Sequence, residues 1–213
     1  MARHAIATED KTARRECILD GARSLFMAGD GTLPSAGDIA QAAGLAKGTV
    51  YLYFRTKEEI FNALLMTSLR SMLDELEASL LAVKGRRAGK VTAFIAAVVA
   101  AIEARPELMR LDNLSYGVLE KNLVAETLRE TKLEFIQALS HTAAVLEAAL
   151  KITTGRGAVL LMRSFAMARG IWQSCQPCAH VFPSDELVLL LQPVFAVELT
   201  EALAEYWRGA LAA

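Results

Sequence analysis

Residues 35 to 59 read SAGDIAQAAGLAKGTVYLYFRTKEE, and this stretch decides the fold. Ser35 can cap the amino end of a short helix, and Gly44 ends that helix after about two turns. A tight connection then leads to a second short helix, from Lys47 to Tyr53. Two short helices around a glycine-containing turn predict a helix-turn-helix.

Long helices are predicted on both sides of this motif. Apolar residues at spacings of three and four indicate a first helix from about Thr8 to Met27, which Gly29 ends. Its periodic apolar residues are Ala13, Cys17, Ile18, Ala22, Leu25 and Phe26. On the carboxyl side, Thr56 and Glu59 form a capping box that opens a long linking helix. The apolar stripe of that helix contains Ile60, Leu64, Met72 and Leu76.

The remainder of the chain is also expected to be helical, with Gly85 and Gly89 as interruptions. Ala and Leu recur throughout and β-branched runs are short, which favours helices packed on helices and no sheet. The expected helices are 91 to 104, one from Pro106, 119 to 150 as the longest, one ending near Ser174, and one from Ser184 that Pro193 kinks. We therefore predict an all-α protein of about nine helices, with an N-terminal domain over residues 1–55 and a larger C-terminal domain over 56–213.

The helix-turn-helix stretch closely resembles the DNA-binding segment of the TetR family of repressors, and the resemblance covers residues 11–72, with the helix-turn-helix at about 35–54. It implies a DNA-binding surface that contains Ser35, Lys47, Gly48, Thr49, Tyr51, Tyr53 and Lys57. At Gly48 a side chain is missing where the recognition helix presses against a phosphate backbone or its neighbour. Lys57 begins a helix, so its ammonium and the free N–H groups of that turn can hold a phosphate, and Ser35 can do likewise. The chain departs from the family pattern at Ala36 and Ala46, where a threonine and a capping serine are common.

The same resemblance implies that the C-terminal domain binds a small molecule and dimerises through its last two helices, at about 155 to 174 and 184 to 211. One short recognition helix contacts little DNA, so we expect a homodimer on a palindromic operator. The expected mechanism is an equilibrium between two conformations of the C-terminal domain. The ligand favours the conformation in which the long linking helix holds the two DNA-binding domains of the dimer at the wrong separation for adjacent major grooves. Residues that can line the pocket are Phe94, Met109, Asn113, Tyr116, Phe135, Met162, Phe165 and Trp172. For each of these residues alone, core packing is the favoured interpretation.

Charge and hydropathy set limits on other classes of protein. The formal net charge is -1, yet residues 1 to 57 carry eight Lys and Arg against six Asp and Glu, so the rest is acidic. This asymmetry suits a DNA-facing head, although ordinary enzymes share it. The amino end does not have the pattern of a signal peptide, and the longest apolar run, 91 to 102, is about half of the roughly 20 residues that a membrane span needs. We expect a cytoplasmic protein without a membrane segment.

Two other interpretations compete with a ligand-responsive DNA-binding regulator. Cys175 and Cys178, with His180 nearby, have the spacing of a redox pair or half a zinc site, although an incidental loop is favoured because no second Cys/His pair is present. His141 is a lone histidine, more typical of a surface or a satisfied core position. A helical interaction module that no longer binds DNA is the other alternative. The sequence has no phosphate-binding loop, nucleophile elbow or zinc-protease pair, so we predict neither an enzyme nor a cofactor.

Overall fold

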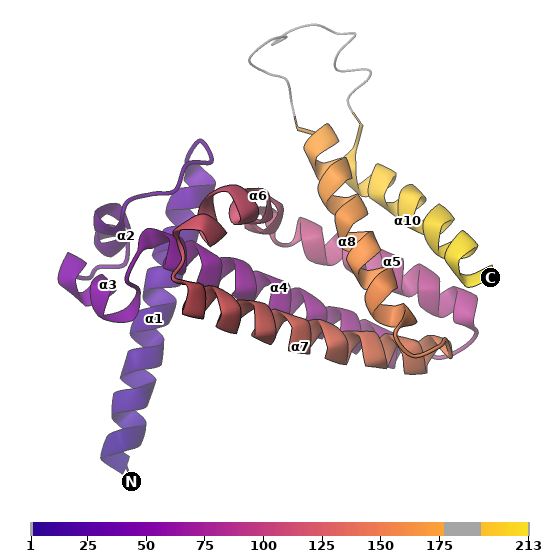
Figure 1. Ribbon diagram of the computed structural model, residues 1–213, viewed down its shortest axis with the longest axis horizontal. Coiled ribbons are helices and arrows are strands. Elements are labelled where there is room, and N and C mark those ends of the chain that lie inside the picture. The colour runs from indigo at the N-terminus through magenta and orange to yellow at the C-terminus, as the bar shows by residue number, and fades with distance from the viewer. Residues whose placement is uncertain (1, 177–192, 213) are drawn as a thin grey trace, which may run out of the picture. The chain divides into compact units, whose positions relative to one another are not determined.

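The computed structural model describes the backbone of residues 2–176 and 193–212, and the side chains from residue 11 onward within those ranges. Nine α-helices and no strand are present in these ranges, which confirms the predicted all-α class. The helices are α1 (Ala2–Ala28), α2 (Ala36–Ala42), α3 (Lys47–Tyr53), α4 (Lys57–Ala82), α5 (Arg87–Glu103), α6 (Pro106–Leu114), α7 (Ala125–Leu150), α8 (Arg156–Ser174) and α10 (Phe195–Ala212) (Figure 1). None of the described helices is long and apolar enough to span a membrane.

Contacts divide the chain into two compact units that are not contiguous in sequence. Unit 1 comprises Met1–Leu69 and Pro106–Leu133, and unit 2 comprises Arg70–Arg105 and Glu134–Ala213. The helices α4 and α7 each contribute residues to both units. The predicted boundary after residue 55 divides the chain into two contiguous domains, and it stays a prediction.

In unit 1, α1 packs against α2 and α6, and α2 packs against α3 (Figure 1). The core includes Phe26 of α1 and Phe61 of α4, whose ring centroids lie 5.5 Å apart. At buried Gly21 an added Cβ would lie 3.2 Å from the backbone nitrogen of Ala43. The close crossing of α1 and α2 therefore depends on Gly21, which the sequence analysis did not single out.

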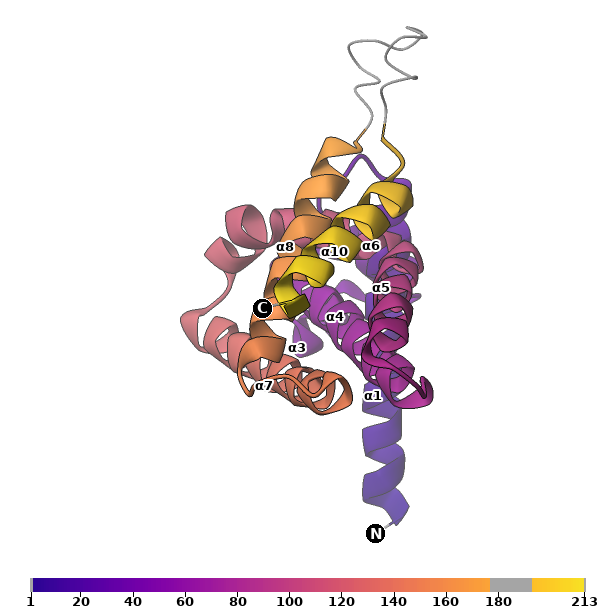
Figure 2. The ribbon, with the colours of Figure 1, turned by 90° about the vertical axis from the view of Figure 1, so that its right-hand side faces the viewer.

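In unit 2, α10 packs against α8 and α5, and the three helices lie together in Figure 2. Trp207 of α10 is fully buried, and its ring centroid lies 5.1 Å from that of Phe94 in α5. The indole Nε1–H donates a hydrogen bond to Oγ of Ser164 in α8, at 2.9 Å. A Cβ added at Gly157 would lie 2.5 Å from the carbonyl oxygen of Ala143, so glycine lets α8 begin against α7. One buried aromatic side chain therefore joins the three helices of this core.

Several predicted helix boundaries are wrong by a few residues or more. The first helix begins at Ala2, and α5 begins at Arg87, so exposed Gly89 lies inside a helix instead of interrupting it. The predicted helix over 119 to 150 begins only at Ala125, because residues 115–119 form a π-helical turn and 120–122 a 3₁₀ turn. Consequently α1, with 27 residues, is longer than α7, with 26. Most of these errors arise because helix ends depend on hydrogen bonds that apolar spacing does not encode.

The burial of α1 and α4 follows the predicted apolar positions in part. Of the apolar residues predicted for the first helix, Ile18, Ala22 and Phe26 are buried. Leu25 is half-buried, and Ala13 and Cys17 are exposed. All four residues of the predicted α4 stripe are buried. The predicted start of the last helix at Ser184 lies outside the described residues, and α10 begins two residues after Pro193.

Candidate nucleic-acid interface

The helix α2 begins and ends with the local signals that its sequence contains. Oγ of Ser35 accepts a hydrogen bond from the backbone N–H of Asp38 at 3.2 Å, and the N–H of Ser35 donates to the Asp38 carboxylate at 3.3 Å. At the other end, Gly44 has a φ of 66°, and the next N–H donates to the Ala40 carbonyl at 2.9 Å. This reciprocal cap and left-handed glycine confirm the predicted bounds of the first short helix.

The second short helix, α3, is anchored from one side only. Val50 is fully buried and Phe54, at the carboxyl end, is nearly so. The guanidinium carbon of Arg15 in α1 lies 5.4 Å from the centroid of the Phe54 ring. Ala46 occupies the cap position of α3 and makes no side-chain cap hydrogen bond, as its departure from the family pattern indicated. The opposite face of α3 is left to solvent.

That outer face carries much of the predicted DNA-binding set. Lys47 and Gly48 are exposed, and 48% of the surface of Tyr51 is accessible to solvent. Thr49 and Tyr53 are half-buried on the flank of the same helix. A Cβ added at Gly48 would have no heavy atom within 4 Å among the described residues. No neighbour in the described chain therefore requires glycine at this position.

The start of α4 ties the motif to the preceding loop. Oγ1 of Thr56 accepts a hydrogen bond from the N–H of Glu59 at 3.2 Å, and the Glu59 carboxylate accepts one from the N–H of Arg55 at 2.7 Å. The Glu59 carboxylate therefore accepts from Arg55, the residue before the expected cap Thr56, and not from Thr56 itself. Nζ of Lys57 donates to the carbonyl oxygen of Leu33 at 3.3 Å. An ammonium has three donors, so Lys57 retains capacity for a phosphate while it holds this loop.

Ser35 and Ala36 differ from the exposed residues of α3. The hydroxyl of Ser35 is already engaged, because it also donates to the Asp38 carboxylate at 2.7 Å. A carboxylate beside it opposes the approach of a phosphate. Ala36, which stands where the family often has a threonine, is buried. The phosphate-binding role predicted for Ser35 stays a prediction, and α3 is the part of the motif with open polar groups.

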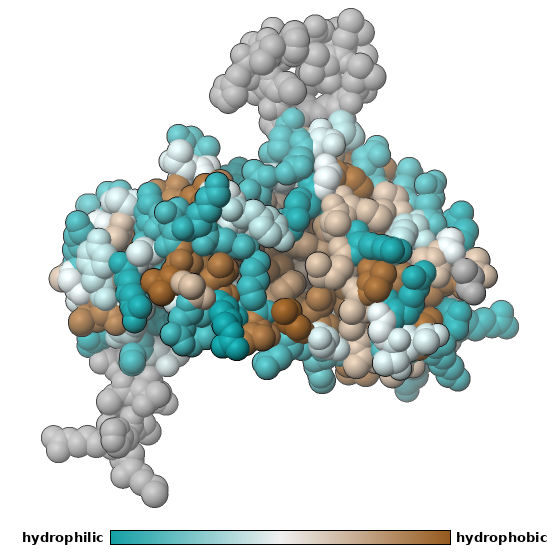
Figure 3. Space-filling view, viewed as in Figure 1, coloured by the Kyte–Doolittle hydropathy of each residue, from teal (hydrophilic) through white to brown (hydrophobic). Residues whose placement is uncertain are grey.

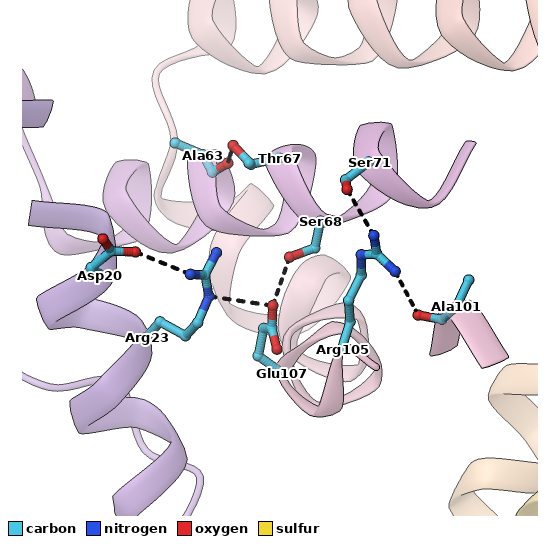
Figure 4. Close-up of polar contacts among 9 residues, drawn as sticks. All are labelled: Asp20, Arg23, Ala63, Thr67, Ser68, Ser71, Ala101, Arg105 and Glu107. Atoms are coloured by element: carbon cyan, nitrogen blue, oxygen red, sulfur yellow. Dashed lines mark hydrogen bonds and ion pairs between the residues drawn. The ribbon is translucent and has the colours of Figure 1, made fainter. Parts of the chain in front are cut away.

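A buried carboxylate in unit 1 connects three helices that the sequence analysis did not relate. Glu107, at the start of α6, accepts a hydrogen bond from Oγ of Ser68 in α4 at 2.9 Å (Figure 4). Nε of Arg23 in α1 lies 3.4 Å from the same carboxylate oxygen. This Nε has no hydrogen-bond partner among the described residues, so the contact is an ion pair without hydrogen-bond geometry. Spacing along the chain contains no signal for this cluster.

The eight predicted ligand-binding residues are divided between the units. Unit 1 contains Met109, Asn113 and Tyr116, and unit 2 contains Phe94, Phe135, Met162, Phe165 and Trp172. Phe94 and Met109 are buried, whereas Tyr116 and Met162 are exposed. The ammonium of Lys132 lies 5.2 Å from the Tyr116 ring centroid, and the Arg169 guanidinium lies 5.7 Å from that of Phe165. Phe94 thus serves core packing against Trp207, and the ligand-binding role of the set stays a prediction.

Cys175 occupies the carboxyl cap of α8 and is half-buried. Burial raises the pKa of its thiol, and the negative charge of Glu198 adds to the increase. Cys178 and His180 lie outside the described residues, so the predicted pair is untested. Within the described ranges, no group of three or more His, Cys, Asp or Glu residues could hold a metal ion. Exposed His141 lies 3.4 Å from the carboxylate of Glu77, consistent with the surface position expected for it.

A long helix packed on the first of two short helices, with one face of the second short helix exposed, defines a helix-turn-helix DNA-binding protein. The family model described as bacterial regulatory proteins of the tetR family matches residues 18–64. A second model, described as the tetracyclin repressor-like C-terminal domain, matches residues 66–213. The chain therefore belongs to the TetR family of bacterial transcriptional regulators, as the resemblance implied.

Individual relatives agree with this assignment. An uncharacterized helix-turn-helix transcriptional regulator of Bacillus subtilis, YfiR, is 32% identical over 74 residues, which is 35% of this chain and 36% of that protein. Among solved structures, a TetR-family regulator from Mesorhizobium loti aligns with a TM-score of 0.65 at 20% identity, over 94% of this chain and 96% of the other. FadR of Bacillus subtilis, solved in complex with stearoyl-CoA, aligns with a TM-score of 0.58 at 18% identity, over 89% and 95%. These structures support the fold.

Proposed function

We propose that this regulator is a repressor that binds a palindromic operator as a homodimer and leaves it when a small molecule binds its C-terminal domain. The observation that carries the DNA-binding part is the outer face of α3, where Lys47, Gly48 and Tyr51 are exposed while Val50 is buried behind them. A lysine can contact phosphates, and a tyrosine hydroxyl can contact phosphates or base edges. Lys57 adds a further cation at the amino end of α4.

The small size of α3, the proposed recognition helix, supports dimerisation. A seven-residue helix reaches few base pairs, so a second half-site about one helical turn away is needed for useful specificity. The packed pair α8 and α10 presents exposed apolar side chains that suit a subunit interface. These side chains are Val159 and Met162 of α8, Val197 of α10, and Val194 directly before α10. At Gly170 of α8 an added Cβ would meet nothing within the described chain, which leaves room for a helix of a second copy.

Regulation by a small molecule requires a link between the two parts of the chain. The helix α4 supplies Lys57–Leu69 to unit 1 and its remaining residues to unit 2, so a ligand that favours one arrangement of unit 2 can act on the head through a continuous helix. FadR, which shares this fold, was solved with stearoyl-CoA, and an acyl-CoA is therefore the first compound to test. If saturating stearoyl-CoA and any compound that copurifies with the protein leave operator affinity unchanged, the effector part of the proposal fails.

A thiol- or metal-responsive regulator that uses Cys175 and Cys178 is the second candidate. Its support is the spacing of the pair, whereas the raised pKa of Cys175 disfavours the reactive thiolate form. Replacing both cysteines with serine separates the two proposals. A small-molecule repressor keeps its operator affinity and its release by the small molecule, whereas a thiol- or metal-responsive regulator loses its response to oxidant or metal.

The central test is fluorescence anisotropy of the full chain with labelled DNA from the region upstream of its own gene, over a salt series. The Lys47→Ala/Tyr51→Ala variant is expected to weaken binding by more than about 100-fold, since each dimer loses contacts from two recognition helices. The slope of log affinity against log salt concentration should decrease in magnitude by about 2, because each of the two protomers loses one phosphate contact. The titration endpoint should give two protomers per duplex.

Lys84→Ala is the matched control, because Lys84 is an exposed lysine distant in sequence from α3. This variant should bind as the wild type does. Equal, salt-sensitive binding of wild type and double variant to any duplex would contradict the assignment of α3 as the reading element. Complete absence of binding at low salt would favour a helical module that no longer binds DNA.

Gly48→Ala is expected to separate stability from DNA affinity. Alanine favours a helix over glycine, and the new methyl group meets nothing in the described chain, so the free energy of unfolding should rise by about 0.5 kcal/mol. The same methyl group lies on the face proposed to meet DNA, so operator affinity should fall by about 10-fold or more. Thermal unfolding and anisotropy measure the two effects. Gly89→Ala, at an equally open position in α5, should leave affinity unchanged, and unchanged affinity in Gly48→Ala would remove DNA approach as the reason for glycine.

A further inference from the structure

Leu52 is the most exposed large hydrophobic side chain in the described part of the chain, with 82% of its surface accessible. It lies in α3, between two tyrosines. In Figure 3, brown apolar surface lies at the position of α3, bordered by teal and white residues. Exposed leucines are ordinary when they are scattered, but this leucine lies on the element proposed to enter the DNA groove. The local fold does not need an apolar residue here, because Val50 and Phe54 already anchor the helix.

The helical geometry places Leu52 on the outer face of α3, opposite buried Val50. At 3.6 residues per turn, positions two apart differ by about 160°, so Leu52 points almost directly away from buried Val50. Gly48, one turn earlier, lies on the same face and contributes no side chain. Tyr51 lies about 100° from Leu52 on one side and Thr49 about 60° on the other, and Lys47 lies beyond Tyr51, about 140° from Leu52. A group that approaches the middle of α3 therefore meets the leucine side chain beside the bare backbone of a glycine.

The major groove offers an apolar partner that fits this arrangement. Bases present hydrogen-bond donors and acceptors there, and thymine adds a C5-methyl group that a side chain without polar atoms can read. A leucine can exclude water from that methyl group but cannot bond to the amino or carbonyl groups of other base pairs. Polar groups left facing Leu52 would lose hydrogen bonds to water, so base pairs without the methyl group are disfavoured.

We propose that Leu52 is a specificity-determining residue that selects thymine at one position of each half-site through contact with its C5-methyl group. The inference rests on the proposed DNA-binding function and adds a base assignment to it. A single buried methyl group changes affinity about fourfold. Two symmetry-related contacts in a dimer complex should therefore change affinity about 15-fold.

The test uses the full chain and the DNA duplexes that it enriches from a random-sequence pool. In an enriched duplex, each symmetric pair of thymines is replaced by uracil, which removes only the methyl groups, and affinity is measured by fluorescence anisotropy. For the wild type, replacement of one symmetric thymine pair by uracil should lower affinity about 15-fold. In Leu52→Ala the thymine duplex should bind more weakly, and uracil at the same pair should change affinity by less than about twofold.

Two control variants make the result specific to this side chain. Leu81→Ala removes another exposed leucine, in α4, and should keep the full methyl dependence. Tyr51→Ala changes the neighbouring position of α3 and should weaken binding while the dependence at the same thymine pair remains. The uracil substitution itself alters no protein residue, so the wild-type result does not depend on the folding of a variant.

The outcomes distinguish this inference from the function beneath it. Enrichment of a palindrome without sensitivity to any uracil pair overturns the role of Leu52 alone. The same holds if Leu52→Ala retains the full sensitivity at that pair. If no duplex is enriched at low salt, the DNA-binding proposal fails and the base assignment fails with it.

Discussion

Trp207→Ala is expected to lower the free energy of unfolding by about 3 to 5 kcal/mol, the largest effect of any single change considered for this protein. The indole is fully buried in α10 and contacts α5 through the ring of Phe94. It also donates a hydrogen bond to Ser164, whose own hydroxyl donates to the Leu160 carbonyl at 2.8 Å. Truncation therefore leaves a cavity among three helices and removes the indole donor from the Ser164 hydroxyl. Denaturant unfolding measures the loss, at several protein concentrations because the proposed dimerisation would add to stability.

Two further variants separate the causes of this loss. Trp207→Phe keeps an aromatic ring but removes the N–H donor, so it should cost about 1 to 2 kcal/mol. Trp172→Ala removes an indole of the same size from a half-buried position of α8 and should cost less than Trp207→Ala. If Trp207→Ala lowered stability by less than about 1 kcal/mol, the packing of α10 against α5 and α8 would be wrong.

Arg23→Met is expected to lower the free energy of unfolding by about 2 kcal/mol. The side chain of Glu107 is only 7% exposed, and Arg23 is the cation beside it. Without the guanidinium, the Glu107 carboxylate remains buried and accepts a hydrogen bond from the Ser68 hydroxyl, but it has lost its cation, and an unpaired buried charge is costly. Because Arg23 belongs to α1 and Glu107 to α6, the loss should loosen α6 from the helix-turn-helix head. Thermal unfolding of the variant measures it.

The control for this prediction is the other partner of Arg23. Asp20→Asn removes an ion pair of 3.1 Å whose carboxylate is 67% exposed, and a pair of this kind contributes little, so stability should change by less than about 0.5 kcal/mol. Adding Glu107→Gln to Arg23→Met should restore much of the lost stability, since the amide is neutral and can still accept from Ser68. Equal losses in Asp20→Asn and Arg23→Met would show that the buried carboxylate does not depend on the guanidinium.

Local sequence determined the DNA-binding motif almost completely. The Ser35 cap, the end of α2 at Gly44 and the bounds of α3 were all predicted correctly, because each depends on residues within about one helical turn. The same is true of Pro106 at the start of α6. Family membership followed from the same stretch, since its residue types are ordered as the fold of the motif requires.

The tertiary structure decided what distant residues do to one another. Gly21 appears in the sequence as a weak helix position, yet its missing side chain lets α1 approach α2. Glu107 has the pattern of an exposed acid in a first turn, yet Arg23 and Ser68 surround it in the interior. Leu52 shows the reverse case, because apolar type favours burial and only the packing of Val50 and Phe54 leaves it outside. Hydropathy and spacing describe a residue and its helix, whereas burial and pairing depend on which helices meet, and those contacts join residues far apart in the chain.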